Sequence, residues 1–143
     1  MDIVRAEEKY ITQIAAVESE SFPDPWSGDS FRSAMDTQGT VSIAAVDGDD
    51  LLGYAVYTEY DGSVYIEKIA VSGAHRRKGV GRALLGAAEG SETVLEVRES
   101  NTSAIEFYKS CGFEQIGTRK GFYSSPTENA AVMRKSVKGS GIC

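Results

Sequence analysis

The sequence has few cysteines and histidines and no long apolar run. Its 143 residues include two cysteines and one histidine. Two cysteines do not make a disulfide framework, so we expect a cytoplasmic protein, and we expect no metal site. No apolar run is long enough to span a membrane, and the stretch MDIVRAEEKY lacks the basic and apolar segments of a signal peptide. These absences predict a protein that does not contact membranes.

Basic residues are outnumbered by acidic ones. The 15 Lys and Arg residues against 21 Asp and Glu residues give a net charge of -6. This balance argues against nucleic-acid binding, which requires a basic face, but not against a cationic substrate. A composition of 41% apolar and 25% charged residues is typical of a globular protein. The length predicts a single domain over residues 1–136 with a flexible tail at 137–143, existing as a monomer or weak dimer.

The spacing of apolar residues predicts four helices and seven strands. The helices are expected over 7–20, from the capping residue Ser27, from about 80 to 90, and from 101 to 112. The strands are expected at 3–5, 41–46, 51–60, 63–71, 93–98, 113–118 and 131–136. Asp-Gly pairs at 47–48 and 61–62 predict hairpins between the second, third and fourth strands. This order implies an α/β fold (α+β mixed): a mixed, mostly antiparallel sheet with helices on both faces.

Basic charge nevertheless gathers in one stretch, HRRKGVGRALL at positions 75–85. A helix is expected to begin there, and the N–H groups at a helix N-terminus suit an anion. Glycines at 79 and 81 would let a phosphate approach the backbone without meeting a Cβ. The stretch has neither the GxxxxGK[ST] pattern of a P-loop nor the third glycine of a dinucleotide-binding fingerprint. Taken alone, these residues favour a pyrophosphate cradle and a solvated basic turn about equally.

Three motifs in order resemble the GNAT N-acetyltransferase superfamily. R-R-K-G-V-G-R-A (76–83) is similar to its R/Q-x-x-G-x-G/A signature, whose loop binds the pyrophosphate of acetyl-CoA. KIAV (68–71) resembles the strand that hydrogen-bonds the pantetheine arm, and NTSAIEFYKSCGF (101–113) resembles a later family helix. The resemblance implies a GNAT fold with acetyl-CoA as acyl donor. The implied cofactor contacts are Ile69, Ala70, Val71, Arg76, Arg77, Lys78, Gly79, Val80, Gly81, Arg82 and Asn101.

A narrower resemblance is to RimI-type enzymes. It rests on FPDPWS (22–27), LEVRESN (95–101) and GFYSSPTENAAVM (121–133). These enzymes acetylate the N-terminal alanine of a small-subunit ribosomal protein, which implies a protein N-terminal amine as acceptor. Two features depart from the family pattern. The segment 82–95 is shorter by about two helical turns, and FPDPW is longer than the usual FPW.

Glu96 is the general base that the RimI resemblance implies. Alternation within TVLEVR places Leu95 and Val97 on one face of a strand and Glu96 on the other. Since Arg98 would share the face of Glu96, an exposed ion pair between these two residues is the structural alternative. Glu67 is a second candidate, as base or as ligand of the acceptor ammonium.

Tyr108 is the expected acid that meets the leaving thiolate. A phenol, with a pKa of about 10, is a weaker acid than a thiol, at about 8.5, so a hydrogen bond that stabilises the thiolate is the expected role. The alternative is a core residue, because Tyr108 shares an apolar face with Ala104, Ile105 and Cys111. Asn101 fits either a helix N-cap or a cofactor contact.

Trp26 and Tyr123 are expected to shape a groove for the acceptor, with ordinary loop burial as the alternative. Three functions stay open on the sequence. The first is an N-terminal protein acetyltransferase, and the second is a GNAT enzyme that acts on a small amine such as a polyamine or on lysine. The third is an acyl-CoA-binding module without catalysis, which the presence of both Glu96 and Tyr108 disfavours.

Overall fold

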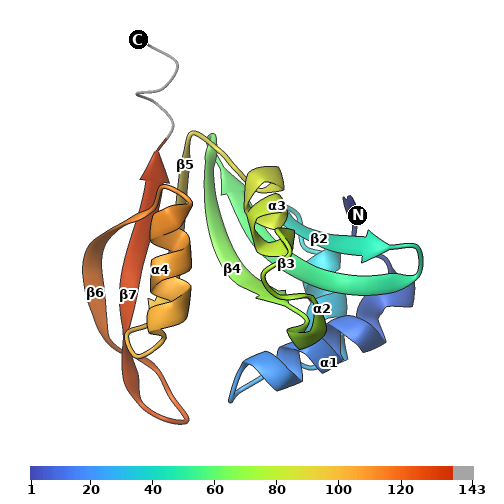
Figure 1. The fold of residues 1–143 in the computed structure, drawn as a ribbon, viewed down its shortest axis with the longest axis horizontal. Helices are drawn as coiled ribbons and strands as arrows, with labels where there is room; N and C mark the ends of the chain where they lie inside the picture. Colours follow the sequence, from blue (N-terminus) through green and yellow to red (C-terminus); the bar gives the residue numbers. More distant parts are fainter. Residues whose placement is uncertain (137–143) are drawn as a thin grey trace.

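Seven strands form one sheet in the order β1-β2-β3-β4-β5-β7-β6 in the computed structural model, which describes residues 1–136 (Figure 1). The strands are β1 (Asp2–Arg5), β2 (Thr40–Asp47), β3 (Asp50–Tyr60), β4 (Ser63–Val71), β5 (Glu92–Arg98), β6 (Glu114–Tyr123) and β7 (Glu128–Ser136). The helices are η1 (Glu8–Tyr10), α1 (Ile11–Ser21), α2 (Gly28–Met35), η2 (Gly73–His75), α3 (Val80–Ala87) and α4 (Thr102–Ser110). The tail predicted at 137–143 lies outside the described residues.

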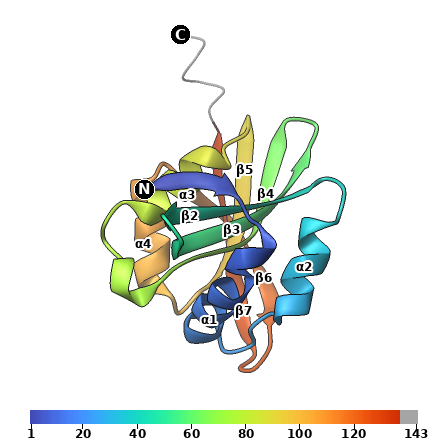
Figure 2. The same ribbon diagram turned by 90° about the vertical axis from the view of Figure 1, so that its right-hand side faces the viewer.

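The sheet is mixed and mostly antiparallel, as the hairpin signals predict. Only the β4–β5 pair is parallel, because α3 crosses between these two strands, and the other neighbouring pairs of described strands are antiparallel. The helices cover both faces: Figure 2 shows α2 on one side of the sheet and α3 and α4 on the other. The fold class predicted from the sequence is therefore confirmed.

The parallel strands β4 and β5 stay together over a short distance only. Their ladder consists of three residue pairs, Ser63–Glu92, Val64–Thr93 and Tyr65–Val94. Beyond these pairs the strands diverge, so that the sheet opens toward one end of the molecule (Figure 1). β4 therefore has a free backbone edge after Tyr65.

A β-bulge in β4 changes which side chains face which side of the sheet. Val56 of β3 pairs with Lys68, while the next residue of β3 pairs with Ile66, so Glu67 is left without a partner. One extra residue reverses the alternation of the strand. Ile66 consequently packs in the core beneath α3 and α4, whereas Ala70 packs in the core beneath α1 and α2.

Two apolar cores hold the layers together. The larger lies between the sheet and the α3–α4 face, and the smaller lies between the sheet and the α1–α2 face. Fully buried side chains mark their centres: Leu84, Leu95 and Met133 in the first, and Ile11, Tyr54 and Val56 in the second. Helix termini follow the predicted capping, because Ser27 accepts from the N–H of Ser30 at 3.2 Å and Asn101 accepts from that of Ala104 at 3.1 Å.

Several predicted element boundaries were wrong. The first helix starts with a turn of 3-10 helix, and β6 and β7 extend to Tyr123 and Glu128, well beyond the predicted strands. Gly90 does not end α3, which stops at Ala87. A Cβ on Gly90 would lie 2.5 Å from the carbonyl oxygen of Gly62, so this glycine allows a close approach to the β3–β4 turn. None of the described helices is long and apolar enough to cross a membrane.

Candidate active site

Glu96 lies on β5 with both carboxylate oxygens occupied. Its side chain is only 4% exposed and points away from the core that contains Leu95. The Tyr65 hydroxyl donates to Oε1, and the Arg119 guanidinium forms an ion pair with Oε2, with its Nε 3.0 Å away. These partners come from β4 and β6, so the carboxylate is held beside the point where β4 and β5 separate.

The alternative pairing predicted for Glu96 was wrong. Arg98 instead forms an ion pair with Glu128 of β7 at 3.1 Å and donates to backbone carbonyls of the loop that joins β6 and β7. Glu128 also accepts from the N–H of Ser100 at 2.6 Å. Arg98 therefore anchors the β6–β7 hairpin and leaves Glu96 to Tyr65 and Arg119.

Tyr65 is kept protonated by its position. Burial raises the pKa of its hydroxyl, and the hydrogen bond to the negatively charged Glu96 raises it further. The hydroxyl therefore stays a donor over the ordinary pH range. Its ring is still partly exposed, so the Tyr65–Glu96 pair faces solvent from the open end of the sheet.

Tyr108 is a buried residue of α4. Its ring contacts Phe107 and Phe113, with centroids at 5.4 and 5.7 Å. Among residues 1–136, no hydrogen bond involves its hydroxyl. Burial raises the pKa of this hydroxyl, with the neighbouring Tyr123 and Cys111 adding to the effect. The ring is thus part of the core, as the structural alternative predicts, while the hydroxyl is left without a protein partner in the described chain.

Tyr123 links the surroundings of Tyr108 and Glu96. Burial raises the pKa of Tyr123 to about 12, and the charge of Glu96 contributes to the shift. The guanidinium of Arg98 lies over the Tyr123 ring, 4.5 Å from its centroid. Because Tyr123 interacts electrostatically with both residues, it brings β5, α4 and the end of β6 into one region.

Glu67 lies at the β4 bulge and is turned toward β3. Its carboxylate is exposed and accepts from the Thr58 hydroxyl at 2.7 Å. Glu67 contributes to the raised pKa of Tyr65, so it lies near the Tyr65–Glu96 pair. As a candidate base it is the more solvated of the two carboxylates.

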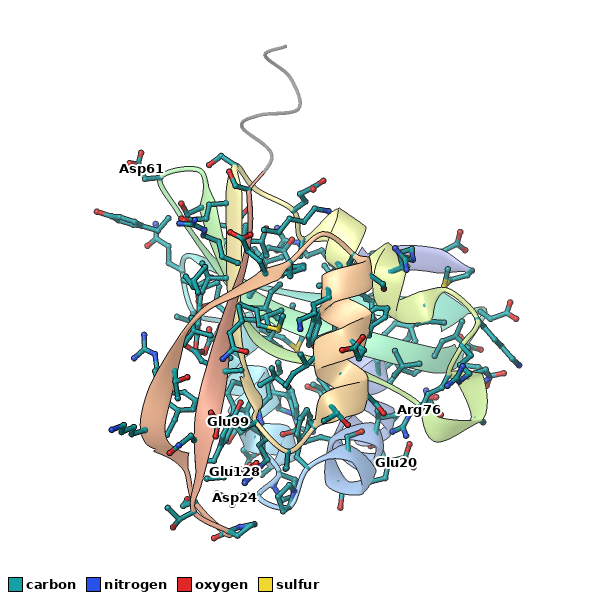
Figure 3. The ribbon with its side chains drawn as sticks, turned by 60° about the vertical axis from the view of Figure 1, so that its left-hand side comes forward. Glu20, Asp24, Asp61, Arg76, Glu99 and Glu128 are labelled. Carbon is teal, nitrogen blue, oxygen red and sulfur yellow. The ribbon has the colours of Figure 1, made fainter. Side chains whose placement is uncertain are left out.

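The free edge of β4 leads directly into the basic turn. Ile69, Ala70 and Val71 pair with β3 on one side, and their other edge lies beyond the three pairs made with β5. Arg76 folds back to donate to the carbonyl of Val71 at 3.3 Å. The N–H of Gly73, just before this turn, donates to Glu20 of α1 at 2.9 Å, and Figure 3 labels Glu20 and Arg76 at this end of the molecule.

The two glycines of the basic turn have different surroundings. Gly79 is the N-cap of α3 with φ +81°, and a Cβ placed there would meet no atom within 4 Å. A Cβ on Gly81 would instead lie 3.1 Å from the Phe107 ring of α4. Open space in front of the helix N-terminus is thus provided at Gly79, whereas Gly81 allows α3 to pack on α4.

The basic side chains of the turn also differ. Arg82 donates to the Ser110 hydroxyl at 3.2 Å and lies over the Phe107 ring, so it is directed to α4. Arg77 and Lys78 form no hydrogen bond or ion pair within the described part of the chain, and Arg77 has a left-handed backbone, φ 62°. The free positive charge beside Gly79 therefore comes from Arg77 and Lys78.

Trp26 ends the loop between α1 and α2. Its half-buried ring packs on Phe31, with centroids 5.2 Å apart, and its backbone N–H donates to the Glu18 carboxylate at 2.9 Å. The α1–α2 loop and the β6–β7 hairpin both lie at the end toward which β4 and β5 diverge (Figures 1 and 2). Trp26 and Tyr123 therefore come from two segments that approach the same end of the molecule.

The sequence was compared with the profiles of known protein families. The sequence profile of the acetyltransferase (GNAT) family matches residues 10–113. The chain belongs to the GNAT acetyltransferase family. GNAT enzymes use acetyl-CoA, and the enzyme class predicted from the three motifs, an acetyl-CoA-dependent N-acetyltransferase, is confirmed.

Relatives of this GNAT enzyme include RimI proteins. The N-alpha-acetyltransferase RimI of Mycobacterium tuberculosis is 31% identical over 124 residues, 78% of this chain and 76% of that protein. The ribosomal protein bS18-alanine N-acetyltransferase of Haemophilus ducreyi is 30% identical over 138 residues, 88% of this chain and 93% of that protein. The crystal structure of the ribosomal-protein-S18-alanine N-acetyltransferase from Escherichia coli has a TM-score of 0.82 at 25% identity, covering 95% of this chain and 93% of that one.

A further relative is longer than this GNAT chain. An uncharacterized protein of Mycobacterium leprae is 34% identical over 142 residues, which make up 90% of this chain and 38% of that protein. The chain thus spans well under half of that protein's length. The RimI-type resemblance predicted from the sequence is confirmed by the relatives named above.

Some residues of this GNAT site were not foreseen from the sequence. Tyr65 and Arg119 hold Glu96, and Lys68 pairs with the buried Glu18. Strand alternation is a signal for Tyr65, but pairing across β4, β5 and β6 depends on the sheet order, which the sequence does not give. Among residues 1–136, no group of three or more His, Cys, Asp or Glu side chains is placed to hold a metal ion.

Proposed function

We propose that the protein transfers the acetyl group of acetyl-CoA to a protein N-terminal amine, with the N-terminal alanine of a small-subunit ribosomal protein as acceptor. The observation that carries the proposal is the nearly buried Glu96 carboxylate, held by Tyr65 and Arg119 where β4 and β5 separate. Relatives named for acetylation of ribosomal protein bS18 align over most of the chain and support the choice of acceptor.

The chain has features that fit acetyl-CoA. The free β4 edge at 69–71 has backbone N–H and C=O groups that the pantetheine arm of acetyl-CoA can hydrogen-bond, in the way that a neighbouring strand would. The open space at Gly79, together with Arg77 and Lys78, suits a pyrophosphate at the N-terminus of α3. Bound there, acetyl-CoA supplies the activated acetyl group. We propose that Arg82 contributes only background positive charge, since its guanidinium is directed to Ser110.

Glu96 is proposed to accept the proton that the protonated amine loses before it attacks the thioester. An N-terminal amine has a pKa near 8, so roughly a tenth is neutral at pH 7 and the base supplies a modest gain. Because both Glu96 oxygens are occupied, the proton reaches Glu96 through the Tyr65 hydroxyl, which takes it up as it passes its own proton on. The raised pKa of Tyr65 favours this coupled transfer over a free tyrosinate.

Tyr108 is proposed to hydrogen-bond the leaving thiolate. Its hydroxyl has no partner within the described chain, and its raised pKa keeps the proton on the oxygen. Asn101 is proposed as an N-cap rather than a cofactor contact, since its side-chain oxygen is committed to the N–H of Ala104. Trp26 and Tyr123 are proposed to border the acceptor peptide, with Glu67 near its ammonium group.

The acceptor is tested by measuring acetyl transfer to three classes of amine. N-terminal peptides, lysine peptides and polyamines are compared at equal concentration, and kcat/KM is expected to be highest for a peptide with N-terminal alanine. A lysine amine, with a pKa near 10.4, needs more help from a base and is expected to react more slowly. Faster transfer to a polyamine or a lysine peptide would reject the proposed acceptor, and binding of acetyl-CoA without transfer to any amine would reject the proposed catalysis.

The cofactor cradle is tested by a matched pair of substitutions at Gly79. Asn and Asp have the same shape and both tolerate a left-handed backbone, but only Asp adds a negative charge beside the pyrophosphate. Gly79→Asp is expected to weaken acetyl-CoA binding at least about tenfold more than Gly79→Asn, which corresponds to about 1.4 kcal/mol. Titration calorimetry measures both affinities.

Two results would contradict this assignment. Equal affinities of the Asn and Asp variants would mean that the pyrophosphate does not lie at Gly79. Loss of binding in both variants together with lowered melting temperatures would indicate a damaged turn instead. Gly81→Glu is a poorer probe, because a side chain there would push against Phe107 and disturb the packing of α3 on α4.

A further inference from the structure

A buried carboxylate beneath the α1–α2 loop has three donors and no role in the reaction. Glu18 of α1 is 0% exposed. Its carboxylate accepts from the Tyr54 hydroxyl and from the Trp26 backbone N–H at 2.9 Å, and it forms an ion pair with the Lys68 ammonium at 2.8 Å. Donors thus come from the sheet and from the loop, so this one carboxylate joins the two.

The loop has few other attachments. It contains Pro23 and Pro25, which have no N–H to donate. The Phe22 N–H donates to the Glu18 carbonyl and so extends the hydrogen-bonding pattern of α1. Ser27, the last residue of the loop, caps α2. Within the described chain, the hydrogen bond from the Trp26 backbone N–H to the Glu18 carboxylate is therefore the one that fastens the end of the loop before α2 to the rest of the protein.

Lys68 completes this attachment through its charge. Its side chain is 16% exposed, and its ammonium lies 4.5 Å from the centroid of the Phe22 ring and 5.3 Å from that of Trp26. Cation–π contacts of this kind are stronger when the charge is desolvated. One lysine therefore neutralises Glu18 and holds the two aromatic residues at either end of FPDPW.

Lys68 lies on the acceptor face of β4 because of the bulge at Glu67. The bulge places Lys68 on the same side of the sheet as Tyr65, three positions earlier, which holds Glu96. The loop that Lys68 holds therefore lies on the same face of the sheet as the proposed base. A fixed wall at that place limits the size of the first acceptor residue.

We propose that Lys68, paired with Glu18 and held between Phe22 and Trp26, is a positioning residue that fixes the α1–α2 loop and restricts the acceptor to N-termini with a small first side chain. This inference rests on the proposed N-terminal acetyltransferase activity. Lys68 touches neither the reacting amine nor the thioester in this account. Its effect is on acceptor selectivity, while acetyl-CoA binding depends on the separate turn at Gly79.

The test compares matched peptides that begin with alanine or leucine and are otherwise identical. Lys68→Met alone would leave Glu18 buried without a counter-ion and endanger folding. The double substitution Glu18→Gln with Lys68→Met removes both charges together, and the Gln oxygen can still accept from the Trp26 N–H. Phe22→Leu leaves the charge pair intact and removes one ring of the contact, so it provides a second variant.

In both variants the alanine-over-leucine ratio of kcat/KM is expected to fall about tenfold, the scale on which a pocket discriminates side-chain size. The Kd for acetyl-CoA is expected to stay within about twofold of wild type. Lys68→Arg keeps the charge and the stacking on aromatic rings and is expected to retain the wild-type ratio.

A wild-type ratio in the folded double variant or in Phe22→Leu would overturn the proposal. So would a loss of selectivity in Lys68→Arg as large as that in the double variant. Failure of the wild-type enzyme to acetylate any N-terminal peptide would overturn the proposed function itself, which separates the two failures.

Discussion

Glu96→Gln is expected to lower the turnover number about tenfold at pH 7 and about 10²-fold at pH 6, the factors by which protonation depletes the neutral amine. The loss is expected to shrink as the pH approaches 9. At pH 7 roughly a tenth of an N-terminal amine is neutral, whereas above its pKa near 8 the amine no longer needs a base. Gln keeps the shape of Glu and can still accept from the Tyr65 hydroxyl, so the substitution removes the basicity and leaves the packing. The measurement is kcat against pH with an N-terminal alanine peptide.

Two further variants sharpen this test. Glu67→Gln is the matched control for the role of base, because Glu67 is exposed and accepts a hydrogen bond from Thr58, and it is expected to leave kcat and its pH dependence nearly unchanged, with any effect confined to KM for the acceptor. Tyr65→Phe is expected to reproduce the pH-dependent loss if the proton passes through its hydroxyl. A loss in Glu96→Gln that is equal at all pH values would show that Glu96 positions its neighbours and is not the base.

Tyr108→Phe is expected to reduce the single-turnover rate about 10²-fold while acetyl-CoA binding is nearly unchanged. The hydroxyl would meet the sulfur only as negative charge develops on it, so its loss affects the transition state more than the bound substrate. The phenyl ring keeps its contacts with Phe107 and Phe113. Single-turnover rates are needed, since slow product release could conceal a defect in the chemical step.

The melting temperature of Tyr108→Phe distinguishes the catalytic role from the structural one. The hydroxyl has no hydrogen-bond partner in the described chain, so removing it is expected to leave the melting temperature nearly unchanged. Tyr123→Phe is the control, because it removes a neighbouring hydroxyl from the same region and is expected to have a smaller effect on the single-turnover rate. An unchanged single-turnover rate in Tyr108→Phe would remove this tyrosine from the proposed mechanism.

Local signals in the sequence predicted most of the fold. The Asp-Gly turns, the apolar runs and the caps at Ser27 and Asn101 depend on neighbouring residues, and the structure follows them closely. Gly90 was misjudged because its role depends on the carbonyl of Gly62, which is distant in sequence. The end of β6 was also missed, since its exposed residues lack the apolar alternation that identifies a strand, and the start of β7 was missed because Glu128 and Asn129 are polar.

The candidate site was less predictable because its contacts join separate strands. The motif match selected Glu96, but no spacing indicated Arg119 as its partner in place of Arg98. The basic turn appeared uniform in the sequence, yet the structure separates Gly79 from Gly81 by what each would touch. Lys68 was passed over because the bulge at Glu67 reverses the strand, and a bulge has no clear sequence signature.

Only three residue pairs join β4 to β5, so the sheet consists of two parts that are connected by a short parallel ladder. The proposed base lies on one part, and the α1–α2 loop, which is proposed to border the acceptor, lies on the other. An acetyl-CoA molecule that lies along the free edge of β4 would therefore replace the backbone hydrogen bonds that β4 and β5 do not make with each other. Acetyl-CoA is then expected to slow amide hydrogen exchange in β4 and β5 and to raise the melting temperature with its concentration. An ordered reaction is therefore expected, in which acetyl-CoA binds between the two parts before the acceptor does.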